Sequence, residues 1–304
     1  MTVCIGVISR PMIIVATDRM ITSGDIQFEQ QQPKIFNIAH NTLALISGDI
    51  AVQTALVDST RAAVQATGIK TVQGVAKVYA DEYANYCQRK AESAVLKSLG
   101  LDSVDALMKR KWPAAVVDEL LRQVQYAAHG DDVATIIAGQ DESGQHLCVI
   151  NQPGIYTVHD RIGFASVGIG QRHAESQFMF AGYTPQWAFP KALYLTYIAK
   201  KHAEVAPGVG QYTDLAVITS GPSANIVVLD PFVGELKSAY DAELHAMGPA
   251  RQSSENYVDE ALRHFLSIPP PTAQPNPALN LSTASTISVP SPADPQAPSA
   301  PKGG

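Results

Sequence analysis

The chain opens with two short apolar runs that are rich in β-branched residues, at positions 2–9 and 12–18. Arg10-Pro11 separates them, so the pattern predicts two buried strands joined by a tight turn. A hairpin centred on this dipeptide sets Thr2 opposite Arg19.

A second hairpin is predicted over residues 33–48, with its turn near His40-Asn41. Centred there, it sets Lys34 across from Ser47 and Gly48. Together with Asp18 of the first hairpin, Lys34 and Gly48 then lie at strand ends. Side chains and free backbone N–H groups can face a cleft at such positions.

Further along the chain, apolar residues at helical spacing predict helices over 50–66 and 72–98. Another helical segment is expected over 104–128, interrupted at Trp112-Pro113. Strands are expected over 133–139, 147–150 and 154–158, helices over 171–182 and 188–204, strands over 213–219 and 225–230, and two terminal helices over 232–246 and 254–266. This order predicts an α+β fold, a four-layer αββα sandwich in which helices cover both faces of two stacked antiparallel sheets.

The globular pattern stops near Ile268, although the chain has 304 residues. Half of the 20 prolines lie beyond this point, where only Asp294 and Lys302 are charged. Because such a segment cannot bury enough apolar surface to order itself, we predict a disordered tail over 269–304. A Pro-rich peptide ligand is the functional alternative for this tail. Residues 1–268 are then long enough for one domain with a sizeable core.

Composition and charge exclude several classes of function. A net charge of −6 without a basic stripe argues against nucleic-acid binding. No apolar run approaches the roughly 20 residues of a membrane span, and the start of the chain lacks a secretory signal. Three widely spaced cysteines are typical of reduced core thiols in a cytoplasmic protein. Eight scattered histidines lack ligand spacing, so we expect no metal site and no cofactor.

Thr2 is the candidate nucleophile. It follows Met1 directly and is small enough for methionine aminopeptidase to remove that methionine. Removal would leave a hydroxyl and a free α-amine on one residue. Because the pKa of an α-amine is about 7.7–8.0, this amine can accept the hydroxyl proton near neutral pH.

The other strand-end groups suit the same chemistry. Lys34 would stabilise the developing alkoxide, and Asp18 would hold that lysine protonated and oriented. The Gly48 N–H would donate to the oxyanion of a tetrahedral intermediate. Taken singly, each residue also fits an ordinary ion pair or strand end. Taken together behind a removable Met1, they favour the catalytic interpretation.

These residues carry a resemblance to proteasome β-type subunits and HslV, which are N-terminal-nucleophile (Ntn) threonine hydrolases. The amino-acid sequence is most similar to that family at residues 16–19 and 46–49, and more weakly similar at 163–170 and 212–218. Among this family, the chain is most similar to bacterial homologues of the betaproteobacterial type. The matching positions fall on the family's nucleophile, aspartate, lysine and oxyanion glycine: Thr2, Asp18, Lys34 and Gly48.

The resemblance implies the Ntn-hydrolase fold, with a helical insertion at about 99–128 and C-terminal helices at about 232–266. It also implies stacked homo-oligomeric rings, as a tetradecamer or alternatively a dodecamer. Peptides or unfolded proteins would be the substrates, and an ATPase unfoldase is a candidate partner. The implied specificity pocket is mostly apolar, which suits apolar or aromatic residues before the scissile bond: Ile21, Gln32, Phe36, Ile46, Ile50 and Thr54.

Two segments depart from the family pattern. The serines of its glycine turn are absent from residues 168–171, and its supporting Asp and Ser have no equivalent in residues 204–210. We therefore expect altered outer support of the nucleophile. Three functions stay open: a ring-forming threonine peptidase, an Ntn amidase acting on small amides, and a catalytically weak or silent assembly.

Overall fold

The computed structural model describes residues 2–23, 26–29, 34–128, 133–220 and 225–266. The chain divides into two units, Met1–His245 and Ala246–Gly304. Among the described residues, no helix has both the length and the apolarity needed to cross a bilayer. The predicted tail over 269–304 lies outside the described residues, and the single domain over 1–268 stays a prediction.

One antiparallel sheet contains the start of the chain. Its strand order is β10-β1-β2-β11-β12. The β1–β2 hairpin turns at Arg10-Pro11 and pairs Ser9 with Met12, so the predicted register is confirmed. The five strands are β1 (Val3–Ser9), β2 (Met12–Asp18), β10 (Phe164–Gly168), β11 (Thr213–Ile218) and β12 (Ile226–Val228).

The second antiparallel sheet has the order β5-β6-β7-β8-β9, and β3 pairs with β4 in a separate two-stranded ribbon. The strands are β5 (Ile35–Ala39), β6 (Thr42–Ser47), β7 (Ala134–Asp141), β8 (Gly144–Gln152), β9 (Ile155–Val158), β3 (Met20–Ser23) and β4 (Ile26–Glu29). The predicted register of the β5–β6 hairpin is wrong. A bulge between Asn37 and Ala39 shifts the pairing, and the Ile46 N–H donates to the Lys34 carbonyl at 3.2 Å. Lys34 therefore lies opposite Ile46, not opposite Ser47 and Gly48.

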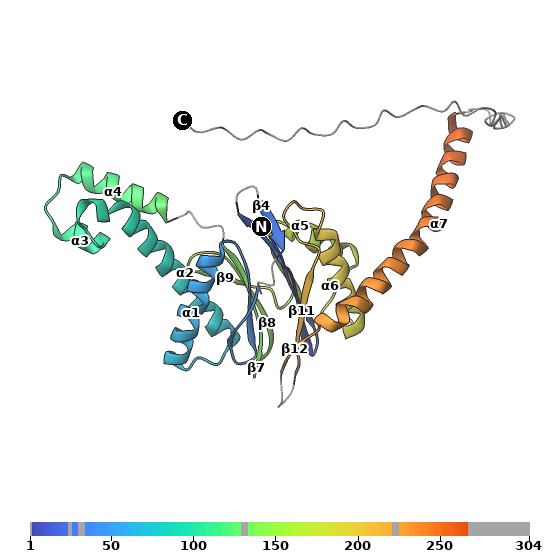
Figure 1. Cartoon of the computed structure of the whole chain (residues 1–304), viewed down its shortest axis with the longest axis horizontal. Coiled ribbons are helices and arrows are strands. Elements are labelled where there is room, and N and C mark those ends of the chain that lie inside the picture. Colours follow the sequence, from blue (N-terminus) through green and yellow to red (C-terminus); the bar gives the residue numbers. More distant parts are fainter. Residues whose placement is uncertain (1, 24–25, 30–33, 129–132, 221–224, 267–304) are drawn as a thin grey trace, which may run out of the picture. The chain divides into compact units, whose positions relative to one another are not determined.

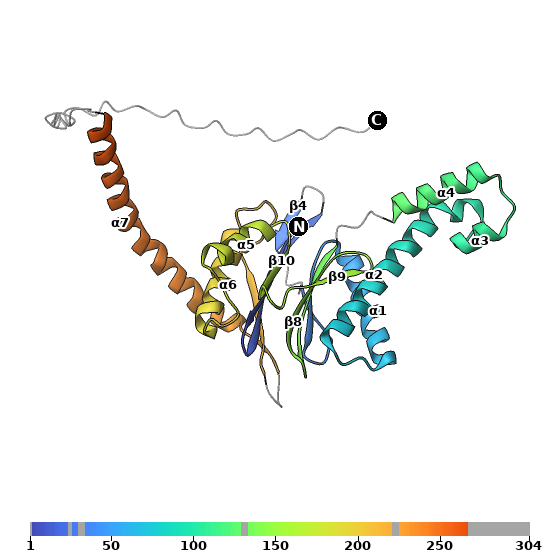
Figure 2. The ribbon, with the colours of Figure 1, turned by 180° about the vertical axis from the view of Figure 1, so that it is seen from behind.

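Helices cover the outer face of each sheet (Figures 1 and 2). Helices α1 (Ile50–Thr67) and α2 (Val72–Val95) pack on the second sheet, and α5 (Gln171–Phe180) and α6 (Phe189–Ala203) pack on the first. A third apolar core lies between the two sheets. This arrangement is the predicted αββα sandwich, consistent with an Ntn-hydrolase fold. Because both faces of β1 and β2 are covered, these strands are apolar at nearly every position.

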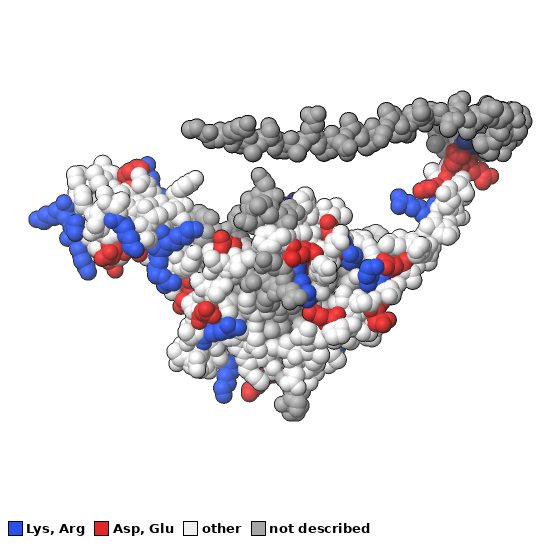
Figure 3. Space-filling model, viewed as in Figure 1, with Lys and Arg blue, Asp and Glu red and all other residues white. Residues whose placement is uncertain are grey.

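The predicted helical insertion forms a small core of its own. Helices α3 (Val104–Lys109) and α4 (Ala114–Ala127) pack with the end of α2, away from the sheets in Figures 1 and 2. Leu96, Leu107 and Val124 are buried there. Lys and Arg side chains gather on this part of the surface in Figure 3. The break between the helices falls at the predicted Trp112-Pro113.

The C-terminal helical region differs from its prediction. One continuous helix, α7 (Val233–Leu266), replaces the two predicted helices and contains Pro249 in its interior. A proline inside a helix removes one backbone hydrogen bond. Ion pairs four residues apart support the helix on both sides of the proline: Lys237–Asp241, Arg251–Glu255 and Asp259–Arg263.

Single 3-10 turns occur at Lys97–Leu99 and Asp230–Phe232.

Candidate active site

Three of the four predicted catalytic residues meet at one end of the sandwich. The Lys34 Nζ donates to Thr2 Oγ1 at 2.5 Å and to Asp18 Oδ1 at 3.1 Å. The Thr2 hydroxyl in turn donates to Asp18 Oδ1. Their exposed fractions are 2% for Thr2, 0% for Asp18 and 5% for Lys34. The cluster is therefore a buried, mutually hydrogen-bonded set of one hydroxyl, one ammonium and one carboxylate.

The local fold explains how these residues meet. The register of the β1–β2 hairpin puts Val3 beside Asp18, and the Val3 N–H donates to Asp18 Oδ1 at 3.0 Å. The other carboxylate oxygen accepts from the Met20 N–H and the Gly210 N–H, each at 2.9 Å. The Met20 carbonyl accepts from Lys34 Nζ at 2.6 Å. Backbone donors from three separate segments thus hold the Asp18 side chain in place.

The glycine turn after β10 contacts the candidate nucleophile through its backbone. Gly168 has a φ of 95°, and a Cβ at this position would press on the Thr2 carbonyl and stand 2.9 Å from Ser47 Oγ. The Gly170 N–H donates to the Thr2 carbonyl at 3.4 Å. The segment in which the family serines are missing therefore still lies against Thr2.

Gly48, the fourth predicted catalytic residue, directly follows β6. It has a φ of 127°, and the next residue, Asp49, caps the N-terminus of α1 by accepting from the Ala51 N–H at 2.7 Å. Its neighbour Ser47 reaches the Gly168 turn that contacts Thr2. The role of the Gly48 N–H as an oxyanion donor stays a prediction.

The predicted specificity residues come from four elements. Ile21 lies half-buried on β3. Phe36 on β5 and Ile46 on β6 both face the core under α1 and α2, where Ile46 is fully buried. Ile50 and Thr54 lie one turn apart on α1, and the Thr54 hydroxyl donates to the Ile50 carbonyl at 3.1 Å. Gln32 lies outside the described residues. The use of these six positions as a specificity pocket stays a prediction.

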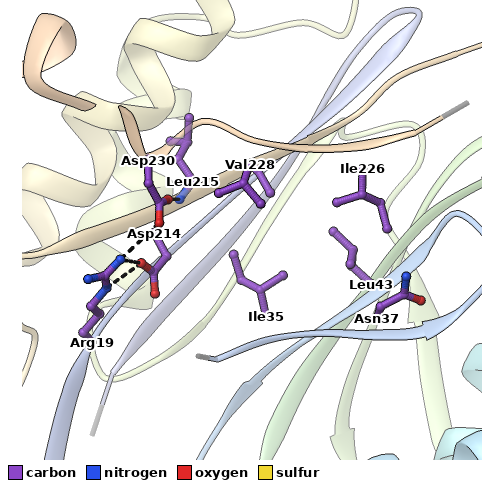
Figure 4. Close-up of a pocket in the computed structure, with 10 residues that line it drawn as sticks. Arg19, Ile35, Asn37, Leu43, Asp214, Leu215, Ile226, Val228 and Asp230 are labelled. Atoms are coloured by element: carbon purple, nitrogen blue, oxygen red, sulfur yellow. Dashed lines mark hydrogen bonds and ion pairs between the residues drawn. The ribbon is translucent and has the colours of Figure 1, made fainter. Parts of the chain in front are cut away.

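A separate cavity of about 610 Å³ lies between the edges of the two sheets (Figure 4). The Arg19 guanidinium on its wall pairs with Asp214 and Asp230, and the hydrogen bond that Arg19 donates to Asp214 raises the pKa of Arg19. Among the described residues, the cavity shares none with the predicted specificity pocket. Its other lining residues are mainly apolar: Ile35, Asn37, Leu43, Leu215, Ala216, Ile226 and Val228.

Two residues that support the cluster were missed in the sequence. Lys200 on α6 is completely buried and Glu29 ends β4, and both bind the segment that carries the Gly210 N–H. Lys200 falls on the apolar stripe that includes Leu193 and Tyr197. A charged residue at a core position of a helix was the signal that could have identified it.

The cysteines and the candidate metal ligands lie as follows in the part of the chain that the structure describes. Within the described ranges, no group of three or more His, Cys, Asp or Glu side chains is arranged to hold a metal. Cys4, Cys87 and Cys148 are all buried, and no disulfide joins them. Burial raises the pKa of the Cys4 thiol beside the cluster, which keeps it protonated.

The αββα fold is consistent with that of an Ntn hydrolase. Residues 2–110 match the family described as Proteasome subunit. The matched range includes Thr2, Asp18, Lys34 and Gly48, and it supports a proteasome β-type subunit. It covers less than half of the 304 residues. A comparison with curated proteins found no match.

Proposed function

We propose that this protein is a threonine peptidase of a self-compartmentalised, proteasome-like ring assembly. The observation that carries the proposal is the ammonium of Lys34, which lies 2.5 Å from Thr2 Oγ1 and is itself held by Asp18. A positive charge at this position stabilises negative charge that develops on the threonine oxygen. The family match over residues 2–110 supports the same assignment.

The mechanism requires Thr2 to become the N-terminal residue. Its α-amine accepts the Oγ1 proton while Oγ1 attacks the peptide carbonyl carbon, and the carbonyl electrons move to the oxyanion. The Gly48 N–H donates to that oxyanion. Collapse breaks the C–N bond, and the leaving amine takes the proton from the α-amine. Water then hydrolyses the Thr2 ester by the same proton transfer and restores the hydroxyl.

The substrates of this proposal are peptides or unfolded chains with an apolar or aromatic residue before the scissile bond. The apolar character of Ile21, Phe36 and Ile50, none of which is fully buried, supports this preference. Similarity to proteasome subunits supports self-association into rings. We propose a double-ring tetradecamer, with a dodecamer as the alternative, in the cytoplasm. An ATPase unfoldase is the candidate partner that would deliver folded proteins.

The test combines intact-mass analysis with a β-lactone probe. We expect the purified protein to have lost Met1 and to gain one acyl group on Thr2, because ring opening of the lactone esterifies the hydroxyl. Thr2→Ala should abolish labelling and peptide turnover. Thr67→Ala is the matched control, because Thr67 is an exposed threonine at the end of α1. Retention of Met1 in the native protein would refute the mechanism.

The same preparation separates the alternative functions. Turnover of small amides without turnover of a peptide library would favour an Ntn amidase. If Thr2→Ala left every measurable activity unchanged, the protein would instead be a catalytically silent assembly. Native mass measured on the processed protein would determine the ring size.

A further inference from the structure

A completely buried lysine lies behind the candidate active site. Lys200 is on α6, and its exposed fraction is 0%. Its ammonium donates to Glu204 Oε1 at 2.6 Å, to the Gly210 carbonyl at 2.9 Å and to the Gln211 carbonyl at 2.8 Å. All three donor positions of the ammonium are thus used, two of them on one short stretch of backbone.

That stretch of backbone reaches the catalytic cluster directly. The Gly210 N–H donates to Asp18 Oδ2 at 2.9 Å, and Lys200 binds the carbonyl of the same residue, which belongs to the next peptide unit. On the other side, Glu29 Oε1 accepts from the Gln211 N–H at 2.6 Å and from the Tyr212 N–H at 3.3 Å. The segment is therefore held by a cation on its carbonyls and by a carboxylate on its N–H groups.

The segment has little room to shift without disturbing the site. A Cβ on Gly210 would stand 3.0 Å from Met20 Cβ and 3.1 Å from the Met20 nitrogen. Met20 also binds two of the three residues of the cluster, since its N–H donates to Asp18 and its carbonyl accepts from Lys34. A displacement of the backbone at Gly210 would therefore be transmitted to both Asp18 and Lys34.

The nearby carboxylates only partly offset the effect of burial on Lys200, and Lys201 adds a like charge, so the pKa of Lys200 lies below its ordinary value. Burial lowers the pKa of Lys200, and the attraction of Glu204 opposes that change. Glu204 also accepts from Lys201 at 2.6 Å, so one carboxylate serves two lysines. The negative charge of Asp18 adds to the field that favours the charged form of Lys200.

We propose that Lys200 is a positioning residue for the Thr2 site. By holding the backbone of Gly210, Lys200 sets the position of Asp18 and thereby that of Lys34. The inference rests on the proposed threonine peptidase activity. In this chain, the buried ammonium of Lys200 holds the backbone carbonyls of the segment next to the site, where the family's supporting Asp and Ser are missing. Lys200 itself touches neither the nucleophile nor the substrate.

The test compares Lys200→Met with Lys201→Met in the processed, assembled protein. Methionine fills a similar volume without a charge or a donor, so the backbone carbonyls lose their partner. Lys201 is the matched control, because it is adjacent on the same helix and also pairs with Glu204 but does not bind the 210–211 backbone. If Lys200→Met fails to fold, Lys200→Gln, which keeps one donor group, takes its place.

Two readouts are expected to change together in Lys200→Met. The rate of β-lactone labelling of Thr2 and kcat for a peptide should fall about 10- to 100-fold while KM changes less than about two-fold, because the nucleophile and not the substrate pocket is displaced. Hydrogen exchange over residues 205–215 should become faster, because the Gly210 N–H loses its fixed orientation. Lys201→Met should match the wild type in both.

The possible outcomes separate this inference from the proposed function. Wild-type labelling and kcat in Lys200→Met would overturn the positioning role, and so would an equal loss in Lys201→Met. If kcat fell while hydrogen exchange over residues 205–215 did not change, Lys200 would not act through the backbone of Gly210. If the wild type itself were neither processed nor labelled at Thr2, the proposed function would fail, and the catalytic part of this inference with it. The exchange measurement would then decide whether Lys200 holds the segment.

Discussion

Substitution of Gly168 by alanine tests whether the glycine turn positions Thr2. In the structure, an added Cβ would stand 2.9 Å from Ser47 Oγ and 3.0 Å from the Thr2 carbonyl carbon, and closer still to the Thr2 carbonyl oxygen. Ordinary contacts between heavy atoms lie at about 3.5–4.0 Å, so the carbonyl group of Thr2 has to move by roughly 1 Å or more. The turn cannot absorb this shift easily, because Gly170 also binds the Thr2 carbonyl.

The shift predicts a defined loss of reactivity. A displacement of about 1 Å between a nucleophile and its partners can lower a rate about 100-fold, so we expect a loss of about 10- to 100-fold in the labelling of Thr2 by a β-lactone. Stability should fall as well, by about 1–3 kcal/mol for overpacking and about 1–3 kcal/mol for a side chain at the φ of 95°. Labelling rates come from time-resolved intact mass, and stability comes from urea unfolding.

Gly182→Ala separates strain from displacement. Gly182 also has a positive φ, 61°, but nothing lies within 4 Å of its added Cβ. This variant should lose about 1–2 kcal/mol of stability and keep the wild-type labelling rate. If Gly168→Ala were processed normally and labelled as fast as Gly182→Ala, the contact between the turn and Thr2 would not position the nucleophile.

Three further variants extend these tests. Lys34→Met should lower peptide turnover by roughly 100- to 1,000-fold while Met1 is still removed, because the charge next to the hydroxyl is lost; normal turnover in a steady-state assay would contradict this. Burial raises the pKa of Asp141, but hydrogen bonds from the Ser143 hydroxyl and the backbone N–H groups of Val72 and Ser143 outweigh it, so this pKa lies below the ordinary 3.8. The resulting stabilisation of the folded protein is complete above about pH 4. It is lost as the pH falls through the lowered pKa that Asp141 has in the folded protein. Asp141→Asn should therefore cost about 1–3 kcal/mol in urea unfolding at pH 7 and progressively less below pH 3.8, whereas a cost independent of pH would contradict it. Leu107→Ala should destabilise the insertion by about 2–5 kcal/mol, read as faster hydrogen exchange in α3 and α4, without slower labelling of Thr2.

Local patterning accounts for the parts of the site that were predicted. Two continuous apolar runs around Arg10-Pro11 predict the first hairpin, and the position of that turn sets which residues pair. Val3 and Asp18 are therefore brought together by contacts only 15 residues apart in sequence. The position of Lys34 at the start of the next hairpin predicts its place in the cluster. Its predicted pairing with Ser47 and Gly48 is wrong, because it lies opposite Ile46. A bulge at Asn37 leaves no signal in the hydrophobic pattern and shifts every residue before it.

Other features depend on how distant segments pack. Two terminal helices are predicted over 232–246 and 254–266, yet α7 is continuous through both ranges and through Pro249 between them. The sequence marks the 168–171 turn only by its missing serines, because the contact between Gly168 and Thr2 joins residues that are far apart in sequence. Sequence patterns report the local conformation and which face is buried. They do not report which distant backbone groups will share one hydrogen bond.

The sequence by itself thus determined the αββα architecture and the meeting of Thr2, Asp18 and Lys34, because both follow from strand patterning and the positions of tight turns. Only the tertiary structure decided what supports that set. The Gly210 N–H that holds Asp18 lies 192 residues further along the chain, and the lysine behind it is on a helix. Hydrogen bonds of this range exist only after the two sheets and their helices have packed, so their partners are specified by the whole fold.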